Sequence, residues 1–275
     1  MNQPLLDVAD LTVEFRRGFR QPPFVAVDRV SLDVRPGETL GLVGESGSGK
    51  TTIGRAILGL TPIAGGRITF AGAVLTSDDG PPRRQLARDL QAVFQDPYSS
   101  LNPMMTVGDI LAEPLQVQGV GSREARQRVQ ELLDQVRLPT NAAQRLPREF
   151  SGGQRQRIAV ARALALAPKL IVCDEPVSAL DLTTQARVLD LLVDIQEQTG
   201  VAYLFISHDL SVVRHISHRV AVLLRGRIVE AGDCEEVTSD PKEPYTQRLL
   251  AASPVADPRL QAERRRAWLE LTRPS

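Results

Sequence analysis

Gly44-Glu45-Ser46-Gly47-Ser48-Gly49-Lys50-Thr51 matches the phosphate-binding pattern G-x-x-x-x-G-K-[ST] at every position. The residues before it, 38–43, read as a buried strand. After it, apolar residues recur at the spacing of one helix face, namely Ile53, Ala56, Ile57 and Leu60. A turn rich in glycine and serine that binds nothing is the alternative, but the strand, the helix and the Lys-Thr pair directly after the last glycine argue against it.

The residue types in this loop suit a polyphosphate. Its glycines let the backbone N–H groups approach an anion at a helix N-terminus, where the helix dipole favours negative charge. Lys50 is predicted to reach the β- and γ-phosphates, and the Thr51 hydroxyl to bind Mg²⁺. The predicted nucleotide contacts in this stretch are Gly44, Glu45, Ser46, Gly47, Ser48, Gly49, Lys50, Thr51 and Thr52.

Composition indicates an ordinary globular protein. The chain has 275 residues, 42% of them hydrophobic, and Lys plus Arg equals Asp plus Glu at 33 each, so we expect no nucleic-acid partner. The two cysteines, Cys173 and Cys234, cannot form a disulfide framework. No signal peptide and no membrane-spanning stretch of roughly 18 apolar residues is recognised, so we expect a cytoplasmic protein that meets a membrane through partners.

In the first part of the chain, the sequence pattern predicts mainly antiparallel strands around the phosphate loop. Leu5 to Phe15 and Val25 to Val34 read as strands joined by a polar loop, and Gly65 to Gly72 reads as a short hairpin. A helical insertion is expected from about 97 to 168, with Ser122 as the N-cap of an amphipathic helix. The tail from Asp240, rich in proline, is expected to be a solvated appendage.

The α/β pattern returns after the insertion. Residues 170–173 form a short apolar run before Asp174, residues 188–195 form a helix face, and residues 201–206 form a strand that ends just before His208. Residues 220–224 and 228–231 read as a closing hairpin.

Three strand ends deliver polar side chains to one edge of a parallel sheet, where open α/β sheets bind ligands. Asp174 can hold the Mg²⁺ set by Thr51, and Glu175 can orient and deprotonate the attacking water. Gln95 can reach a metal-bound or attacking water, and His208 can donate to the γ-phosphate. Each of these residues alone is also compatible with a structural role, as a turn residue or a buried polar group.

A second anion cradle is predicted at Ser151-Gly152-Gly153-Gln154, which precedes the helix expected from Arg155 to Ala167. One nucleotide does not need two such cradles from the same polypeptide. We therefore infer that this cradle serves the nucleotide of a neighbouring subunit.

The motif set resembles that of ATP-binding-cassette (ABC) ATPases, over about Leu5 to Asp233. The motifs are Gly44 to Thr51, Gln95, Phe150 to Gln154, Leu170 to Glu175, Ser178-Ala179-Leu180-Asp181 and His208. The resemblance implies an α/β fold, a P-loop NTPase (RecA-like) core with an antiparallel β subdomain and the inserted α-helical subdomain at about 97–168. It implies an ABC ATPase domain over 5–239 and a C-terminal extension of the peptide-importer type over 240–275.

Three longer segments resemble the dipeptide, oligopeptide and nickel import ATPases of bacteria: Gly41 to Lys50, Val93 to Pro103 and Pro244 to Leu250. That resemblance implies an ATPase at the cytoplasmic face of the bacterial inner membrane, with ATP and Mg²⁺ as cofactors. It also implies a head-to-tail dimer with a second ABC ATPase, either a paralogue or the same chain. The further partners are two transmembrane permease subunits and, indirectly, an extracytoplasmic solute-binding protein.

The resemblance also assigns roles residue by residue. Ser151, Gly153 and Gln154 would contact the γ-phosphate bound by the partner, Asp181 would couple the two sites, and Gln95 would link nucleotide to the region that contacts the permease. Phe15 is the first candidate for stacking on adenine, with Phe19 and Phe24 as alternatives. Phe150 stands where the family usually has leucine, and the chain lacks the C-terminal cysteine cluster of several relatives.

Other classes of protein fit less well. A soluble ABC ATPase of repair or translation is the main alternative, but 52–150 leaves no room for the long coiled coil of repair types, and translation types usually carry two cassettes. An exporter ATPase is disfavoured only by the importer-like segments around Gln95 and Tyr245. The guanine-reading Asn-Lys-x-Asp stretch of a GTPase is missing. The transported solute, peptide, nickel or a related compound, is left open.

Overall fold

The computed structural model describes residues 3–16, 18, 22–76, 82–96 and 100–252. Phe19 and the segment 97–99 of the importer-like motif lie outside the described residues. The chain divides into two compact units, one formed by Met1–Gly80 with Phe205–Ser275 and the other by Pro81–Leu204. We call them unit 1 and unit 2.

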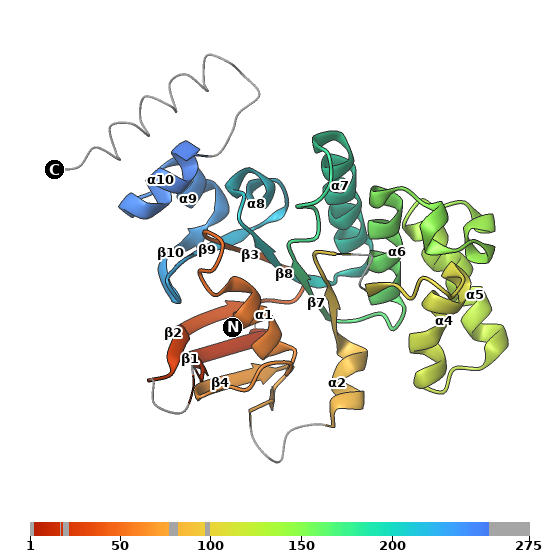
Figure 1. Ribbon diagram of the computed structural model, residues 1–275, viewed down its shortest axis with the longest axis horizontal. Coiled ribbons are helices and arrows are strands. Elements are labelled where there is room, and N and C mark those ends of the chain that lie inside the picture. The colour runs from red at the N-terminus through yellow and green to blue at the C-terminus, as the bar shows by residue number, and fades with distance from the viewer. Residues whose placement is uncertain (1–2, 17, 19–21, 77–81, 97–99, 253–275) are drawn as a thin grey trace. The chain divides into compact units, whose positions relative to one another are not determined.

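Unit 1 contains a four-stranded antiparallel sheet in the order β2-β1-β4-β5, seen at the red and orange end of Figure 1. Its strands are β1 (Leu6–Phe15), β2 (Phe24–Val34), β4 (Gly65–Phe70) and β5 (Ala73–Val74). Along β1 the apolar side chains of Leu6, Val8, Leu11 and Val13 are buried, as alternation predicts. Asp10 and Arg29 adopt left-handed backbone angles near the register shifts of this pair, which is typical of bulges.

Unit 1 also contains a second set of paired strands, and the phosphate loop follows one of them, β3 (Thr39–Val43). This strand is buried at every residue and pairs in parallel with β9 (Arg219–Leu224), which pairs antiparallel with β10 (Arg227–Asp233). The predicted closing hairpin is therefore confirmed.

Two helices of unit 1 adjoin this strand. α1 (Lys50–Ile57) begins within the phosphate loop, and α8 (Leu210–Ile216) packs on β3. A Cβ atom on Gly41 would lie 2.2 Å from Val213, so this strand position must be glycine for α8 to pack so closely.

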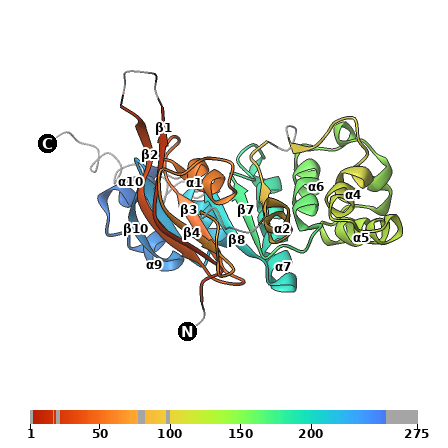
Figure 2. The same cartoon turned by 90° about the horizontal axis from the view of Figure 1, so that it is seen from below.

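The C-terminal part of unit 1 is helical. α9 (Cys234–Ser239) and α10 (Pro244–Ala252), drawn in blue, lie beside β10 in both views (Figures 1 and 2). Tyr245 is 3% exposed and Thr246 is fully buried. The expectation that the tail from Asp240 is a solvated appendage is therefore wrong over α10, because this helix buries two side chains against the unit.

Unit 2 contains the strands that carry the predicted acidic residues. β6 (Leu90–Val93) pairs in parallel with β7 (Leu170–Asp174), and α7 (Leu182–Thr199) follows β7. β8 (Ala202–Ser207) crosses the boundary between the two units. A helix that sequence patterns did not predict, α2 (Arg83–Asp89), precedes β6.

The remainder of unit 2 is helical, as expected, and is drawn in yellow-green to green in Figure 2. It comprises α4 (Val107–Val117), α5 (Ser122–Gln135), the 3₁₀ turns η1 (Thr140–Gln144) and η2 (Pro147–Glu149), and α6 (Gly152–Leu164). The prediction that Ser122 is the N-cap of α5 is wrong. Gly121 occupies that position and, having no side chain, cannot cap the helix through one. α6 begins three residues earlier than predicted because Ser151 caps it.

Within the described ranges, no helix combines the length and the apolar character needed to cross a bilayer.

Candidate nucleotide-binding site

The phosphate loop has backbone angles that require glycine. Gly44 has φ 155° and Gly49 has φ 110°, both in the region that side chains disfavour. Added Cβ atoms would also lie 2.2 Å from the Leu223 carbonyl oxygen and 2.6 Å from the Ala26 carbonyl oxygen, respectively. The loop therefore packs directly on neighbouring backbone.

Backbone hydrogen bonds hold the loop in this shape. The Ser48 N–H donates to the Glu45 carbonyl at 3.2 Å, and the Gly226 N–H of the closing hairpin donates to the Ser48 carbonyl at 2.8 Å. The Ser48 hydroxyl is buried and finds no hydrogen-bond partner among the residues that the structure describes. An unpaired buried hydroxyl is costly, so a ligand that hydrogen-bonds to it would fit this loop.

The charge distribution of the loop favours an anion. α1 starts at Lys50 with a glycine N-cap, no capping side chain and no acidic residue in its first turn, so no carboxylate of that turn competes with a bound anion for the positive end of the helix dipole. Lys50 is only 4% exposed, and its ammonium group donates to the carbonyl oxygens of Gly44 at 2.6 Å and Glu45 at 2.8 Å. A buried ammonium favours a nearby negative charge, which a polyphosphate supplies.

In unit 2, Gln95 and Glu175 lie together. The Gln95 amide donates to the Glu175 carboxylate at 3.3 Å and to the Ser178 hydroxyl at 3.2 Å. The Ser178 hydroxyl donates to the Glu175 backbone carbonyl at 3.1 Å. Asp174, which precedes Glu175 in the chain, is 8% exposed. The Gln95 bond thus orients the Glu175 carboxylate, and the Ser178 bond holds its backbone carbonyl, just past the carboxyl end of β7.

Glu175 adopts a left-handed backbone conformation, φ 49°. That conformation costs a residue with a side chain about 1–2 kcal/mol, and such strain concentrates at functional sites. Sequence patterns gave no role to Ser178, although it lies in the quoted Ser178-to-Asp181 segment.

The second predicted cradle is built at the N-terminus of α6. The Ser151 hydroxyl accepts from the Gln154 N–H at 3.3 Å, and the Gln154 side-chain oxygen accepts from the Ser151 N–H at 3.0 Å, a reciprocal capping box. The Ser151 hydroxyl hydrogen is not used in this box. It therefore provides a donor at the exposed end of the helix.

The cradle packs tightly against the start of α7. A Cβ atom on Gly153 would lie 2.2 Å from Cγ2 of Thr184. The Thr184 N–H donates to Asp181 at 3.0 Å, so Asp181 is the N-cap of α7, and hydrogen bonds from Thr184 lower the pKa of Asp181. Thr184 is a residue that sequence patterns missed, because its role is steric.

His208 and the aromatic candidates belong to unit 1. His208 is exposed and directly follows β8. Phe15 and Phe24 face each other across the β1–β2 pair and are each 43% exposed, so both are accessible for stacking.

The predicted site residues thus fall in two groups. Unit 1 holds the phosphate loop, Phe15 and His208, and unit 2 holds Gln95, Asp174, Glu175, the Ser151–Gln154 cradle and Asp181. Assembly of the phosphate loop, Gln95, Asp174, Glu175 and His208 around one nucleotide stays a prediction, as does contact of the cradle with the nucleotide of a partner. The described residues contain no cluster of three or more His, Cys, Asp or Glu side chains suited to a metal, and binding of Mg²⁺ by Thr51, Gln95 and Asp174 also stays a prediction.

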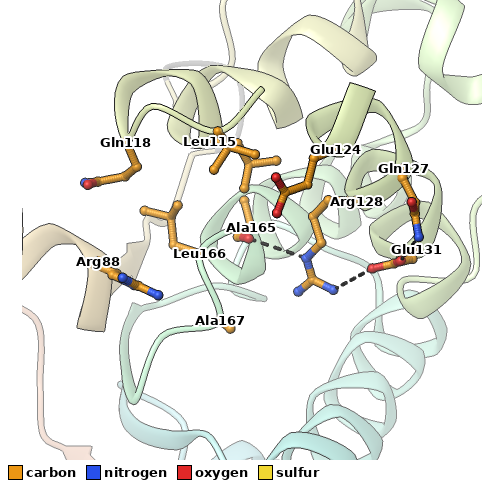
Figure 3. Close-up of a pocket in the computed structure, with 11 residues that line it drawn as sticks. Arg88, Leu115, Gln118, Glu124, Gln127, Arg128, Glu131, Ala165, Leu166 and Ala167 are labelled. Carbon is orange, nitrogen blue, oxygen red and sulfur yellow. Dashed lines mark hydrogen bonds and ion pairs between the residues drawn. The ribbon is translucent and has the colours of Figure 1, made fainter. Parts of the chain in front are cut away.

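A pocket of about 570 Å³ in unit 2 contains none of these residues (Figure 3). Arg128 reaches the carbonyl oxygens of Leu164 at 3.2 Å and Ala165 at 3.4 Å, and the Glu131 carboxylate at 3.2 Å. It thereby satisfies carbonyl groups at the C-terminal end of α6, which is a stabilising role. The residues that line this pocket include both acidic and basic side chains, so their charge does not select one class of ligand, and we assign the pocket none.

A family profile described as "ABC transporter" matches residues 27–178, more than half of the chain. The chain belongs to the ABC transporter family. The matched region contains the phosphate loop and the segment around Glu175, so the resemblance seen in the motifs is confirmed.

Curated ABC relatives match most of this chain. It is 55% identical over 233 residues to the oligopeptide transport ATP-binding protein OppD of Mycobacterium tuberculosis, covering 85% of this chain and 38% of OppD. It is 53% identical over 241 residues to the glutathione import ATP-binding protein GsiA of Escherichia coli K12, covering 87% of this chain and 39% of GsiA. The chain therefore spans about two fifths of the length of these relatives.

Solved structures confirm the fold class. The ATP-binding cassette MJ0796, in a dimeric post-hydrolysis state bound to ADP and Pi, superposes with a TM-score of 0.74 at 29% identity, over 83% of this chain and 98% of that one. CbiO1 of Clostridium perfringens, part of the ABC transporter complex CbiONQ, superposes with a TM-score of 0.78 at 24% identity, over 94% and 98%. The chain has the α/β fold of an ABC cassette with its antiparallel β subdomain.

Proposed function

We propose that this chain is the ATP-binding subunit of a bacterial ABC importer, and that it hydrolyses ATP to power the uptake of peptides or a related solute such as nickel. The ATPase domain would extend over 5–239, with a helical subdomain at about 97–168, followed by the C-terminal extension at 240–275. The observation that carries the proposal is the glycine-dependent phosphate loop with the buried ammonium of Lys50.

Hydrolysis would use residues of both units. The phosphate loop, 44–52, would bind the phosphates, with Lys50 on the β- and γ-phosphates and Phe15 against adenine. Thr51, Asp174 and Gln95 would hold Mg²⁺, which neutralises developing charge on the phosphates. Water attacks the γ-phosphorus, its proton passes to Glu175, and the bond to ADP breaks, while His208 donates to the γ-phosphate.

A second cassette would complete each site. Ser151, Gly153 and Gln154 would contact the γ-phosphate bound by the partner, and Asp181 would couple the two sites. The cradle at the N-terminus of α6 supports this proposal because it adds a second anion site to the chain. MJ0796 forms a dimer, which supports the same arrangement.

The relatives support the importer class. OppD is named for oligopeptide transport and GsiA for glutathione import. We propose that two permease subunits bind this ATPase at the cytoplasmic face of the inner membrane, that a second ABC ATPase, identical or paralogous, pairs with it, and that a solute-binding protein feeds the permeases.

The enzymatic proposal is tested by Glu175→Gln and Lys50→Ala, with phosphate release and ATP affinity both measured. We expect Glu175→Gln to keep ATP affinity and lower turnover by roughly 10²-fold or more, because the group that deprotonates water is lost. Lys50→Ala should weaken ATP binding by at least about tenfold, since a charge-assisted hydrogen bond contributes about 1.5–3 kcal/mol. Glu197→Gln, on the exposed surface of α7, is the matched control. Normal turnover of Glu175→Gln would refute its role.

The transport proposal is tested by purifying the tagged chain from detergent-solubilised membranes of its native host. Two multi-span permeases and a second ABC ATPase should co-purify. Recovery without any membrane partner would instead favour a soluble ABC ATPase.

A further inference from the structure

The C-terminal helix α10 reaches the phosphate loop of unit 1. The hydroxyl group of Tyr245 accepts a hydrogen bond of 3.0 Å from the backbone N–H of Glu45, the second residue of the loop. These residues are 200 positions apart in the sequence. Tyr245 is only 3% exposed, so its side chain is held inside unit 1, and the bond itself is partly buried.

The Glu45 residue is thereby held on both sides. Its N–H is bonded to Tyr245, and its carbonyl oxygen accepts from the Lys50 ammonium at 2.8 Å and from the Ser48 N–H at 3.2 Å. If Lys50 turned toward a bound phosphate, its hydrogen bond to the Glu45 carbonyl oxygen would be lost. The bond that Tyr245 accepts does not involve Lys50, so movement of the lysine does not by itself break it.

The helix that carries Tyr245 is itself anchored. Directly before α10, the backbone N–H groups of Lys242 and Glu243 donate to the carboxylate of Glu230 on β10, at 2.8 and 3.4 Å. The Gln247 side chain donates to the Pro241 carbonyl at 2.9 Å. α10 lies beside β10 and α9 in both views (Figures 1 and 2), so the tyrosine hydroxyl comes from a fixed element.

We propose that Tyr245 is a positioning residue for nucleotide binding and that α10 keeps the phosphate loop in its binding conformation. The inference rests on the proposed nucleotide site and assigns to the C-terminal extension a part in ATP affinity. Residues of the loop that are already ordered lose less conformational entropy when phosphate binds. Burial also raises the pKa of Tyr245, so the phenol stays neutral and does not repel a polyphosphate.

Tyr245→Phe tests this proposal because it removes only the hydroxyl. The matched control is Tyr203→Phe, in unit 2, whose buried hydroxyl donates to the Leu192 carbonyl at 3.2 Å. Both variants lose one buried hydroxyl bonded to backbone, but only one of these bonds involves the phosphate loop. Three quantities are measured on the full chain: the dissociation constant for Mg·ATP, the KM and kcat of hydrolysis, and hydrogen exchange of the Glu45 amide.

For Tyr245→Phe we expect the dissociation constant and KM to rise about three- to tenfold, the range of one neutral hydrogen bond, with kcat nearly unchanged. Exchange of the Glu45 amide should become faster. Tyr203→Phe should leave all three at the wild-type values. If Tyr245→Phe binds ATP within twofold of the wild type, or shifts no more than Tyr203→Phe, the positioning role is refuted. Failure of the wild type to bind ATP would instead refute the proposed function.

Discussion

Gly153 offers a test of how the second cradle is held against α7. Replacing it by alanine places a Cβ atom 2.2 Å from Cγ2 of Thr184, far inside the van der Waals distance, while the next atom, Cβ of Thr184, is at 3.7 Å. The overlap thus involves a single methyl group. Thr184→Ser removes that methyl group and keeps the backbone N–H that donates to Asp181.

The cost follows from this geometry. Overpacking a well-packed site costs typically 1–3 kcal/mol, and Thr184 relieves part of the overlap only by changing its restricted χ1 angle. Alanine in place of glycine in a helix otherwise stabilises by up to about 1 kcal/mol. We therefore expect Gly153→Ala to lower the free energy of unfolding by about 1–2 kcal/mol in the wild type and to be neutral or stabilising in the Thr184→Ser background. The coupling energy is then about 2 kcal/mol.

Urea unfolding of the four proteins, followed by far-UV circular dichroism, measures this coupling. Gly152→Ala is the matched control, because a Cβ atom there would lie 3.5 Å from Leu180, an ordinary contact. The reasoning fails if Gly153→Ala costs no more than Gly152→Ala, or if Thr184→Ser leaves its cost unchanged.

Three further predictions concern unit 1. Burial raises the pKa of the Cys234 thiol to about 11, so at pH 8 it should react with a thiol reagent about 10²-fold more slowly in the native chain than after unfolding; reaction at the rate of a free cysteine would contradict this. Arg219 bonds the carboxylates of Asp33, at 2.9 and 3.0 Å, and Glu38, and it lowers the pKa of Asp33. A carboxyl group whose pKa is lowered by folding stabilises the folded chain above its unfolded pKa, near 3.9. Arg219→Gln should therefore lower the free energy of unfolding by about 1–2 kcal/mol at pH 7 and by progressively less below about pH 4. A difference in unfolding free energy that does not change with pH would count against this prediction. Phe15→Leu should raise the ATP dissociation constant about fivefold or more, and a larger effect of Phe24→Leu would transfer the stacking role to that residue.

The elements with strong local signals could be predicted from the sequence. β3 is apolar after its first residue, Thr39, and β1 alternates, so the burial of their apolar residues follows directly from these patterns. The loop at Gly44 to Thr51 is recognisable because its glycines recur at a fixed local spacing. Backbone angles require glycine at Gly44 and Gly49, and close approach of the Leu223 and Ala26 backbone requires it as well. Asp174 and Glu175 are predictable as candidate site carboxylates because they stand at the end of an apolar strand.

Elements without such signals were missed. α2 has seven residues, starts after a proline and makes no side-chain cap, so neither periodicity nor capping marks it. Because serine is a good capping residue, the sequence predicts the N-cap of α5 at Ser122, one residue after Gly121, which holds that position. Ser178 and Thr184 act through distances to Gln95 and Gly153 that no local pattern encodes.

The error at the C-terminus has a specific physical origin. Only Tyr245 and Thr246 are buried among the nine residues of α10, too few to give a hydrophobic period that stands out in a sequence rich in proline. The helix is held instead by Glu230, twelve residues before Lys242, and by a bond to Glu45, 200 residues away. Such contacts exist only after β10 and the phosphate loop have formed. The resemblance of Pro244 to Leu250 to the importer ATPases was therefore a better guide than composition, and Tyr245→Phe tests whether that segment contributes to nucleotide binding.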